Sequence, residues 1–290
     1  MPRPRALACP ASLKGVLSAR AAASALADGF KQAGVECVQM PLADGGEGTV
    51  DALGAQRDGA TVVEAAQAIP LDPERLDVMA ASSRPFGELL AGLEAERLLV
   101  GVGGTSTMDA GVGLLEVLDA LPAPTTVLCD VRTTLYDAPR LFGPQKGATP
   151  EQVVELERRF RSLDALAPFA ALPGSGAAGG LGAALASLGA ELVPGAATIL
   201  YLLGFDAPAY DLVVTGEGRV DATTAEGKAP AEVARRCDEA GVTCVLFGGV
   251  VTEPLAGAET VPLSGDPARA AEDLVELGLR LGTRLLDAAG

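Results

Sequence analysis

Histidine and tryptophan are both absent from this chain of 290 residues. Without histidine there can be no Ser-His-Asp triad, no phosphohistidine intermediate and no histidine-ligated metal site. Any general base is therefore expected to be an Asp or a Glu. Aromatic residues make up only 3% of the chain although hydrophobic residues reach 49%, so Ala, Val and Leu must build the core.

Positive charge is also scarce, because 22 Lys and Arg residues face 38 Asp and Glu residues. The resulting net charge of −16 argues against a nucleic-acid partner, whose phosphates would be repelled. No apolar run is long enough to span a membrane, so no membrane partner is expected. The five cysteines have no metal-ligand spacing, and most lie in or beside apolar runs. We interpret them as reduced core residues of a cytoplasmic protein: Cys9, Cys37, Cys129, Cys237 and Cys244.

Strand-like and helix-like segments alternate along the chain. This alternation predicts an α/β fold, in which helices cover a parallel sheet. The expected strands are Ala6–Cys9, Val35–Leu42, Ala60–Ala66, Leu98–Val102, Thr126–Asp130, Asp211–Thr215 and Val242–Gly248. The expected helices are Ser18–Ala33, Gly46–Ala55, Phe86–Ala95, Asp109–Leu121, Thr149–Leu163, Pro230–Ala240 and Asp266–Leu286.

Two acidic, glycine-rich patches follow strand-like runs. The first is Asp44-Gly45-Gly46-Glu47-Gly48-Thr49, and the second is Gly216-Glu217-Gly218-Arg219-Val220-Asp221, closed by Gly227-Lys228. Ligands of α/β sheets bind outside the carboxyl ends of the strands, where glycines let the backbone approach a bound group. Carboxylates there can hold Mg²⁺ or accept a hydroxyl proton, and a lysine that opens a helix suits a phosphate.

Each of these patches also has a purely structural interpretation. Asp44 and Glu47 have the spacing of a capping box at a helix start. The second patch resembles a solvated loop between a strand and a helix. Ser12 and Lys14 fit either a surface turn or an anion site at the approach to the next helix. The Pro- and Gly-rich surroundings of Lys146 are typical of a plain loop.

Seven stretches, taken in chain order, resemble the bacterial type I family of glycerate kinases. Together they extend over most of the chain. They are residues Pro10–Ala19, Leu42–Thr49, Val102–Thr107, Cys129–Val131, Phe142–Pro150, Gly174–Gly180 and Thr215–Asp221, the last followed by Gly227-Lys228-Ala229-Pro230.

This resemblance implies ATP-dependent phosphorylation of D-glycerate to 2-phosphoglycerate, with ATP and Mg²⁺ required. It also implies two α/β domains, one inserted in the other. Residues 1–65 and 205–290 would form a flavodoxin-like parallel-sheet domain, and residues 66–204 the inserted α/β domain. The absence of histidine is compatible with this reaction, since positioning and charge neutralisation carry most of phosphoryl transfer. A homodimer is a candidate assembly.

The resemblance also assigns roles to residues of the two patches and of two further loops. Asp44 and Asp221 are expected to bind Mg²⁺ or accept the hydroxyl proton, and Lys228 to contact a phosphate or carboxylate. We expect Lys14, Asp44, Asp221 and Lys228 to border one cleft. The expected substrate-binding residues are Ser12, Lys14, Gly45, Gly46, Glu47, Lys146, Glu217 and Arg219.

The chain departs from the family pattern at several positions near these loops. Ala11 stands where the family usually has Asp, and Met108 where it usually has Asn. Thr133 and Thr223 also differ from the usual residues, and the chain is shorter around Gln67–Asp77 and Asp119–Thr125. These departures leave two alternatives: a kinase for another small hydroxy acid, or a catalytically weak ligand-binding homologue.

Overall fold

The computed structural model describes residues 4–221, 224 and 228–289. The chain folds into two compact units. The first unit consists of Met1–Ala43 and Ile199–Gly290, and the second of Asp44–Thr198. The second unit is therefore an insertion in the first, as expected for two α/β domains. Each unit has its own sheet and its own core.

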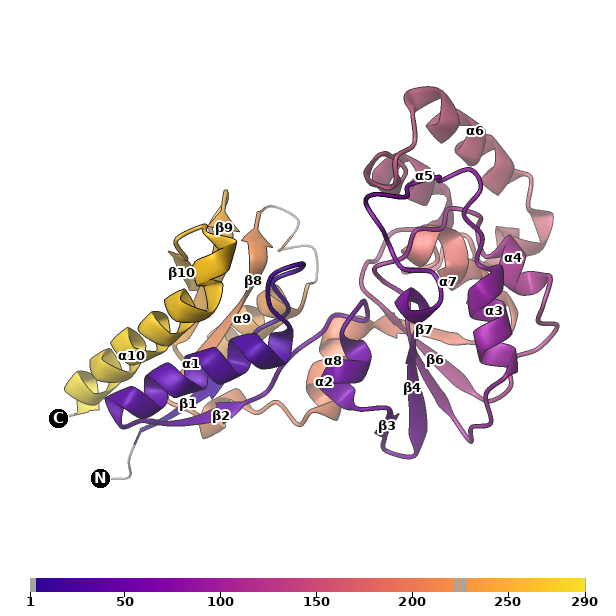
Figure 1. The fold of residues 1–290 in the computed structure, drawn as a ribbon. Helices are drawn as coiled ribbons and strands as arrows, with labels where there is room; N and C mark the ends of the chain where they lie inside the picture. Colours follow the sequence, from indigo (N-terminus) through magenta and orange to yellow (C-terminus); the bar gives the residue numbers. More distant parts are fainter. Residues whose placement is uncertain (1–3, 222–223, 225–227, 290) are drawn as a thin grey trace. The chain divides into compact units, whose positions relative to one another are not determined.

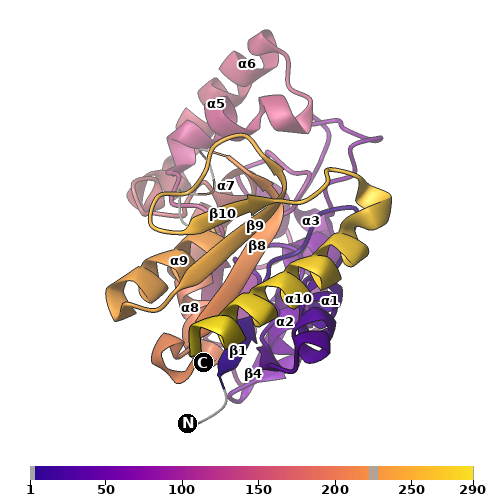
Figure 2. The ribbon, with the colours of Figure 1, turned by 90° about the vertical axis from the view of Figure 1, so that its left-hand side faces the viewer.

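The first unit is built on a five-stranded parallel sheet. Its strand order, β2-β1-β8-β9-β10, is that of flavodoxin-like folds. Figures 1 and 2 show α1 and α10 side by side on one face of this sheet and α9 on the other. The elements are β1 (Arg5–Ala8), α1 (Ala19–Ala33), β2 (Glu36–Gln39), η5 (Ala207–Ala209), β8 (Leu212–Val220), α9 (Ala229–Ala240), β9 (Cys244–Val251), β10 (Glu259–Pro262), η7 (Pro267–Arg269) and α10 (Ala270–Ala289).

The second unit has a mixed sheet of order β3-β4-β5-β6-β7. The edge pair β3–β4 is antiparallel and the other neighbours are parallel. Its elements are α2 (Thr49–Leu53), β3 (Gln56–Arg57), β4 (Ala60–Glu64), η1 (Ala65–Gln67), α3 (Arg84–Ala91), β5 (Leu98–Gly101), α4 (Val112–Leu115), β6 (Thr125–Cys129), η2 (Leu135–Asp137), α5 (Ala138–Phe142), η3 (Pro144–Lys146), α6 (Pro150–Arg161), η4 (Asp164–Phe169), α7 (Ala177–Ser187), β7 (Glu191–Pro194) and α8 (Gly195–Leu202), the last of which runs into the first unit.

Residues 44–65, expected in the first domain, group with the second unit. The physical reason is strand pairing. β4 pairs in parallel with β5 over four of its residues, from Thr61 opposite Leu98 to Glu64 opposite Gly101. The hydrogen bonds of this ladder tie the segment to the second sheet.

Two expected helices, those that start at Ser18 and Thr149, have capped first turns in the structure. Ser18 caps α1 by accepting a hydrogen bond from the N–H of Ala21. Thr149 and Gln152 form a capping box at the start of α6, with Pro150 at the first helical position. Side chains that bond the free N–H groups of a first turn act over only a few residues, so they are visible in the sequence.

Several expected elements differ in length from those of the structure, and three of them have a clear local cause. The expected strand Asp211–Thr215 continues to Val220, because Gly216 and the residues after it keep pairing with β9. The expected helices Gly46–Ala55 and Asp109–Leu121 shrink to the short α2 and α4. In both cases a glycine in the left-handed region, Gly48 or Gly111, delays the helix start.

Alanine, valine and leucine dominate both cores, as the composition requires. Cys9, Cys129, Cys237 and Cys244 are buried as free thiols, whereas Cys37 is half-buried. Among the described residues, no helix combines the length and the apolar character that crossing a membrane demands.

Helices α1 and α10 touch through their backbones. A Cβ atom on Gly29 of α1 would lie 2.1 Å from the carbonyl oxygen of Val275 and 2.6 Å from the nitrogen of Leu279. Similarly, a Cβ atom on Gly278 would lie 2.3 Å from the carbonyl oxygen of Leu26. The two helices can cover the sheet together only because these positions carry no side chain.

We predict that Gly29→Ala lowers the free energy of unfolding by about 2 kcal/mol, because the new methyl group forces the helices apart. Alanine favours an isolated helix, so a destabilised variant would point to the helix contact. Urea unfolding measures the effect. Asp28→Ala, at the neighbouring exposed position of α1, is the control and should leave stability nearly unchanged. Equal stability of both variants would contradict the packing argument.

Candidate active site

The strand order of the first unit reverses between β1 and β8, which makes a topological switch point at their carboxyl ends. The segment after β1 and the second half of β8 touch there. The N–H of Ala11 donates to the carbonyl oxygen of Gly216 at 2.9 Å. A Cβ atom on Gly218 would lie 3.3 Å from the Cα of Leu13. The two segments carry five expected site residues: Ser12, Lys14, Glu217, Arg219 and Asp221.

Glu217 lies within β8, not in a solvated loop, and its side chain is only 13% exposed. Its carboxylate accepts a hydrogen bond of 2.7 Å from the hydroxyl of Thr224 and pairs with Nζ of Lys228 at 3.5 Å. The hydroxyl of Thr224 in turn accepts from the N–H of Asp221. Glu217 therefore orients both Lys228, the N-cap residue of α9, and the backbone that carries Asp221.

Two cations at this end of the first unit have different surroundings from Lys228. Lys14 and Arg219 are both exposed. Neither forms an ion pair with another residue in the described part of the chain. Ser12, which precedes Lys14, is half-buried. An anion approaching the switch point would thus meet positive charge that pairs with no carboxylate of the described residues.

In the second unit, the Asp44–Thr49 loop lies on the carboxyl ends of the strands. A Cβ atom on Gly45 would lie 2.4 Å from the carbonyl oxygen of Leu128, and one on Gly195 would lie 2.0 Å from that of Asp44. The N–H of Gly103 donates to the carbonyl oxygen of Gly45 at 3.1 Å. Backbone packs directly on backbone here, so a side chain at any of these glycines would displace the loop.

Asp44 does not cap a helix. Its Oδ1 accepts from the N–H of Gly46 at 3.2 Å, and α2 begins only at Thr49, with Gly48 as the N-cap residue. Its other carboxylate oxygen makes no hydrogen bond to the described residues. Glu47 is exposed and forms no capping box. The capping alternative for this patch is therefore wrong, and one oxygen of Asp44 has no hydrogen-bond partner among the described residues.

Lys146 is buried in the second unit, at the end of η3. Its Nζ donates to the carbonyl oxygen of Thr107 at 2.8 Å. Burial lowers the pKa of Lys146 to about 8, and the carboxylates of Asp130 and Asp109 act in the opposite direction by favouring the ammonium form. The loop interpretation from the local sequence is wrong for this side chain, because tertiary packing encloses it.

The two carboxylates near Lys146 have different roles. Asp109 is saturated with hydrogen bonds from the backbone of Ser83, Gly111 and Gly113 and from the Ser83 hydroxyl. It therefore fixes local structure. Asp130 follows β6 directly, and a Cβ atom on Gly103 would lie 2.4 Å from its Oδ2. Sequence reasoning quoted Asp130 in a motif without choosing it, although its place after a strand was a usable signal.

Sequence reasoning also missed Glu64, a buried residue at the carboxyl end of β4. Its carboxylate accepts a hydrogen bond from the N–H of Val50 in the first turn of α2. Burial raises the pKa of Glu64, while the N–H groups of Val50 and Gly48 lower it. Glu64 thus holds the helix that follows the Asp44 loop. An acid that ends an apolar strand was the available signal.

Two of the four residues that depart from the family pattern form backbone hydrogen bonds. Ala11 contributes the N–H bond to Gly216 described above, and Thr133 accepts one from the N–H of Gly176 at 2.9 Å through its carbonyl oxygen. Met108 is buried. Thr223 lies outside the described residues.

The carboxylates present are chemically compatible with Mg²⁺. In the described part of the chain, no three His, Cys, Asp or Glu residues group around a metal position. Mg²⁺ does not require such a cage, because it keeps several waters and takes one or two carboxylates together with substrate phosphates. The oriented carboxylate of Asp44, with one oxygen available, suits that role.

Comparison with known proteins gives a consistent result. The sequence profile of the glycerate kinase family matches residues 6–68, 54–123 and 119–264. Glycerate 2-kinase of Escherichia coli K12 is 33% identical over 322 aligned positions, and glycerate kinase of Bacillus subtilis 31% over 321, each alignment covering 84% of both chains. A crystal structure from Salmonella typhimurium LT2, assigned as glycerate kinase 2, superposes with a TM-score of 0.75 at 27% identity, over 99% of both chains.

The lowered pKa of Lys146 predicts how stability depends on pH. Between its folded pKa of about 8 and its ordinary value of 10.5, the unfolded chain binds more protons than the folded one. The free energy of unfolding should therefore rise with pH in this window, relative to Lys146→Met, by up to about 3 kcal/mol. The gain is lost as the pH falls from 10.5 to 8, and below 8 both states are protonated.

Urea unfolding at pH 7.5, 9 and 10 measures this difference. Lys31→Met, at an exposed position of α1, should show no such pH dependence relative to the wild type. Parallel pH profiles of the wild type and Lys146→Met would contradict the lowered pKa.

Proposed function

Because this chain belongs to the glycerate kinase family, a family of phosphotransferases, we propose that it phosphorylates D-glycerate at the 2-hydroxyl with ATP, giving 2-phosphoglycerate. The observation that carries the proposal is the chemistry at the carboxyl ends of the strands. Carboxylates and cations lie together there in the first unit, beside the switch point at which flavodoxin-like sheets bind ligands. A kinase needs both kinds of side chain.

Mg²⁺, when bound, neutralises charge on the transferring phosphates. In the first unit we assign Asp221 to this ion or to the proton of the substrate hydroxyl. In the second unit we assign Asp44 to the same pair of roles. The supporting geometry is that Thr224 braces the backbone of Asp221 and that Gly46 orients one oxygen of Asp44. In a chain without histidine, carboxylates are the available general bases.

The cations would bind the anionic groups of the substrates. Lys14 and Arg219 suit phosphate or carboxylate oxygens, because both are exposed and neither has an ion-pair partner among the described residues. Ser12, near Lys14 in the chain, can donate a hydrogen bond from its hydroxyl group to the same anion. Lys228 is already oriented by Glu217. A preoriented ammonium group costs little reorganisation when charge develops in the transition state.

Three further residues of the Asp44 loop would contribute to substrate binding, two through the backbone and one as an exposed side chain. Gly45 and Gly46 place the loop on the strand ends, and Glu47 is exposed beside Gly104. For Lys146 we propose an indirect contribution, in which its bond to Thr107 holds the neighbouring loop. The expectation that Lys14, Asp44, Asp221 and Lys228 border one cleft involves both units and stays a prediction.

Two alternatives keep specific support. A different small hydroxy acid as substrate is favoured by the departures at Ala11 and Met108, because a missing polar partner in a pocket for a hydroxyl-rich acid changes selectivity strongly. A ligand-binding homologue with weak catalysis is favoured by the shortened loops. Against it stand the ordered Glu217–Thr224–Asp221 network and the oriented Asp44.

We predict that Asp44→Asn and Asp221→Asn each lower kcat at least about 100-fold, because each removes a carboxylate charge needed for metal or proton handling. The amide oxygen of Asn can still accept from the N–H of Gly46, so Asp44→Asn should keep its melting temperature within about 2 °C. A coupled assay of ADP release measures kcat.

The matched control is Asp28→Asn, which removes the same charge from an exposed position of α1 and should leave kcat unchanged. Near-normal kcat in both site variants would rule out these assignments. A large loss of stability in Asp44→Asn would show instead that Asp44 serves the fold.

We predict that the purified protein, given ATP, Mg²⁺ and D-glycerate, forms 2-phosphoglycerate as the main product. Phosphorus NMR distinguishes this ester from 3-phosphoglycerate. Turnover of a different hydroxy acid in preference to glycerate would favour the first alternative. No ADP release across a panel of hydroxy acids, together with measurable binding of nucleotide or glycerate, would favour the second.

A further inference from the structure

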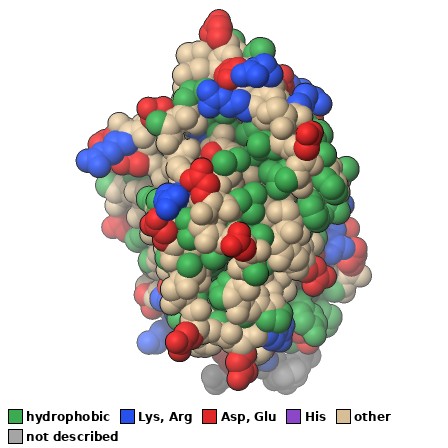
Figure 3. Space-filling model, turned by 90° about the vertical axis from the view of Figure 1, so that its right-hand side faces the viewer, with side chains coloured by type: hydrophobic (Ala, Val, Ile, Leu, Met, Phe, Trp, Pro, Cys, Tyr) green, Lys and Arg blue, Asp and Glu red, His purple; other side chains and the backbone are tan. Residues whose placement is uncertain are grey.

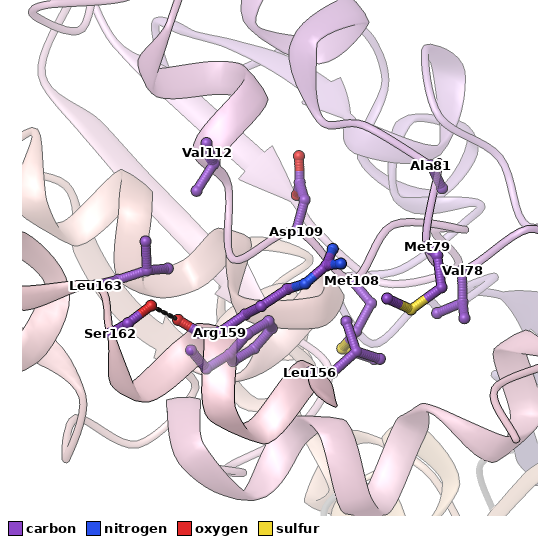
Figure 4. A pocket seen from close by; sticks show the side chains of 11 residues that line it. Val78, Met79, Ala81, Met108, Asp109, Val112, Leu156, Arg159, Ser162 and Leu163 are labelled. Carbon is purple, nitrogen blue, oxygen red and sulfur yellow. Dashed lines mark hydrogen bonds between the residues drawn. The ribbon is translucent and has the colours of Figure 1, made fainter. Parts of the chain in front are cut away.

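A pocket of about 290 Å³ lies within the second unit, apart from the carboxylates discussed above for catalysis. Three segments form it: residues 78–81, residues 108–112 and the second half of α6 with the residues after it (Figure 4). The pocket is lined by Val78, Met79, Ala81, Met108, Asp109, Val112, Leu156, Arg159, Phe160, Ser162 and Leu163.

The interior of this pocket is apolar. Val78, Met108, Leu156 and Phe160 are almost completely buried. Asp109 is the acidic residue of the lining, and four hydrogen bonds from Ser83, Gly111 and Gly113 hold its carboxylate in place. Such a surface gains free energy when it contacts an apolar group instead of water. The two methionines add adaptability, since the Met side chain fills irregular space.

Arg159 is the polar group at the mouth. In Figure 4 its side chain extends from α6 toward the segment of Met108 and Asp109. Its Nε donates to Glu155 at 2.8 Å, while its two terminal nitrogens make no hydrogen bond to the described residues. Figure 3 shows the side of the molecule that lies on the right in Figure 1. Lys and Arg side chains gather near the top of this side, at the end where Figure 1 places α6, and hydrophobic side chains lie below them. Basic residues fill the last turn of α6: Arg158, Arg159 and Arg161.

We propose that this pocket binds a small amphipathic carboxylate, with the apolar body among the methionines and the carboxylate on Arg159. The terminal nitrogens of a guanidinium group match two carboxylate oxygens. An apolar cavity of roughly 150 Å³ holds a benzene molecule, so this pocket suits a body of about six to eight carbon atoms. Glycerate, which is rich in hydroxyl groups, does not fit an apolar lining. The proposed ligand therefore differs in chemistry from glycerate, and the carboxylates assigned to the kinase reaction, Asp44 and Asp221, do not line this pocket.

The four methionines of the chain allow a direct test. The full-length protein is labelled with ¹³C at the methionine methyl groups and titrated with hexanoate, followed by NMR. We expect saturable shifts of the Met79 and Met108 signals, with Met40, which lies in the first unit, unchanged. Hexanamide, which has nearly the same shape without the charge, should bind roughly tenfold more weakly.

Arg159→Gln should weaken hexanoate binding roughly tenfold, to the level of hexanamide. The matched control is Arg158→Gln, because Arg158 also pairs with Glu155 but does not line the pocket. It should bind hexanoate like the wild type, and the methyl spectrum itself reports whether each variant is folded. Unshifted Met79 and Met108 signals at 20 mM hexanoate, equal binding of hexanamide, or equal losses in both variants would overturn the proposal.

Discussion

Direct contact between backbone segments is the constraint on which both candidate sites depend. In the second unit, Gly45, Gly103 and Gly195 let the Asp44 loop lie on the ends of β5, β6 and β7 with no side chain between them. In the first unit, Gly216 lets β8 pack directly against Phe247 of β9, and Gly218 lets it lie close to Leu13 in the segment after β1. At the first four of these glycines a Cβ atom would lie 2.4 Å or less from a neighbouring atom, whereas at Gly218 it would make a tight contact of 3.3 Å.

Rigid backbone contact has a chemical consequence for the polar residues beside it. Asp44 and Asp221 lie where the main chain is already held by other bonds, from Gly103 to Gly45 and between Asp221 and Thr224. The main chain beside both carboxylates is therefore already ordered, and the N–H of Gly46 also orients the carboxylate of Asp44. Preorganised charge of this kind is the main resource of an enzyme that moves a phosphoryl group by positioning and electrostatics.

Charge in the two units is handled differently. The first unit keeps Lys14 and Arg219 exposed and orients Lys228 through Glu217. The second unit buries Lys146 and satisfies its ammonium group with a backbone carbonyl and nearby carboxylates. An exposed cation attracts a ligand, whereas a buried one fixes the backbone it bonds to. We therefore interpret Lys146 as a support of the Thr107 loop.

The sequence by itself determined the family to which the chain belongs and some of its local structure. The order of the glycine-rich stretches implied the family and the inserted α/β architecture. Ser18 and Thr149 located two helix starts, because a capping residue acts on its neighbours in the chain. Only the tertiary structure decided the extension of β8 to Val220, the burial of Lys146, the role of Glu64 and the existence of a pocket beside Arg159. Each of these depends on contacts between segments distant in the chain, and neither composition nor periodicity records which segments meet.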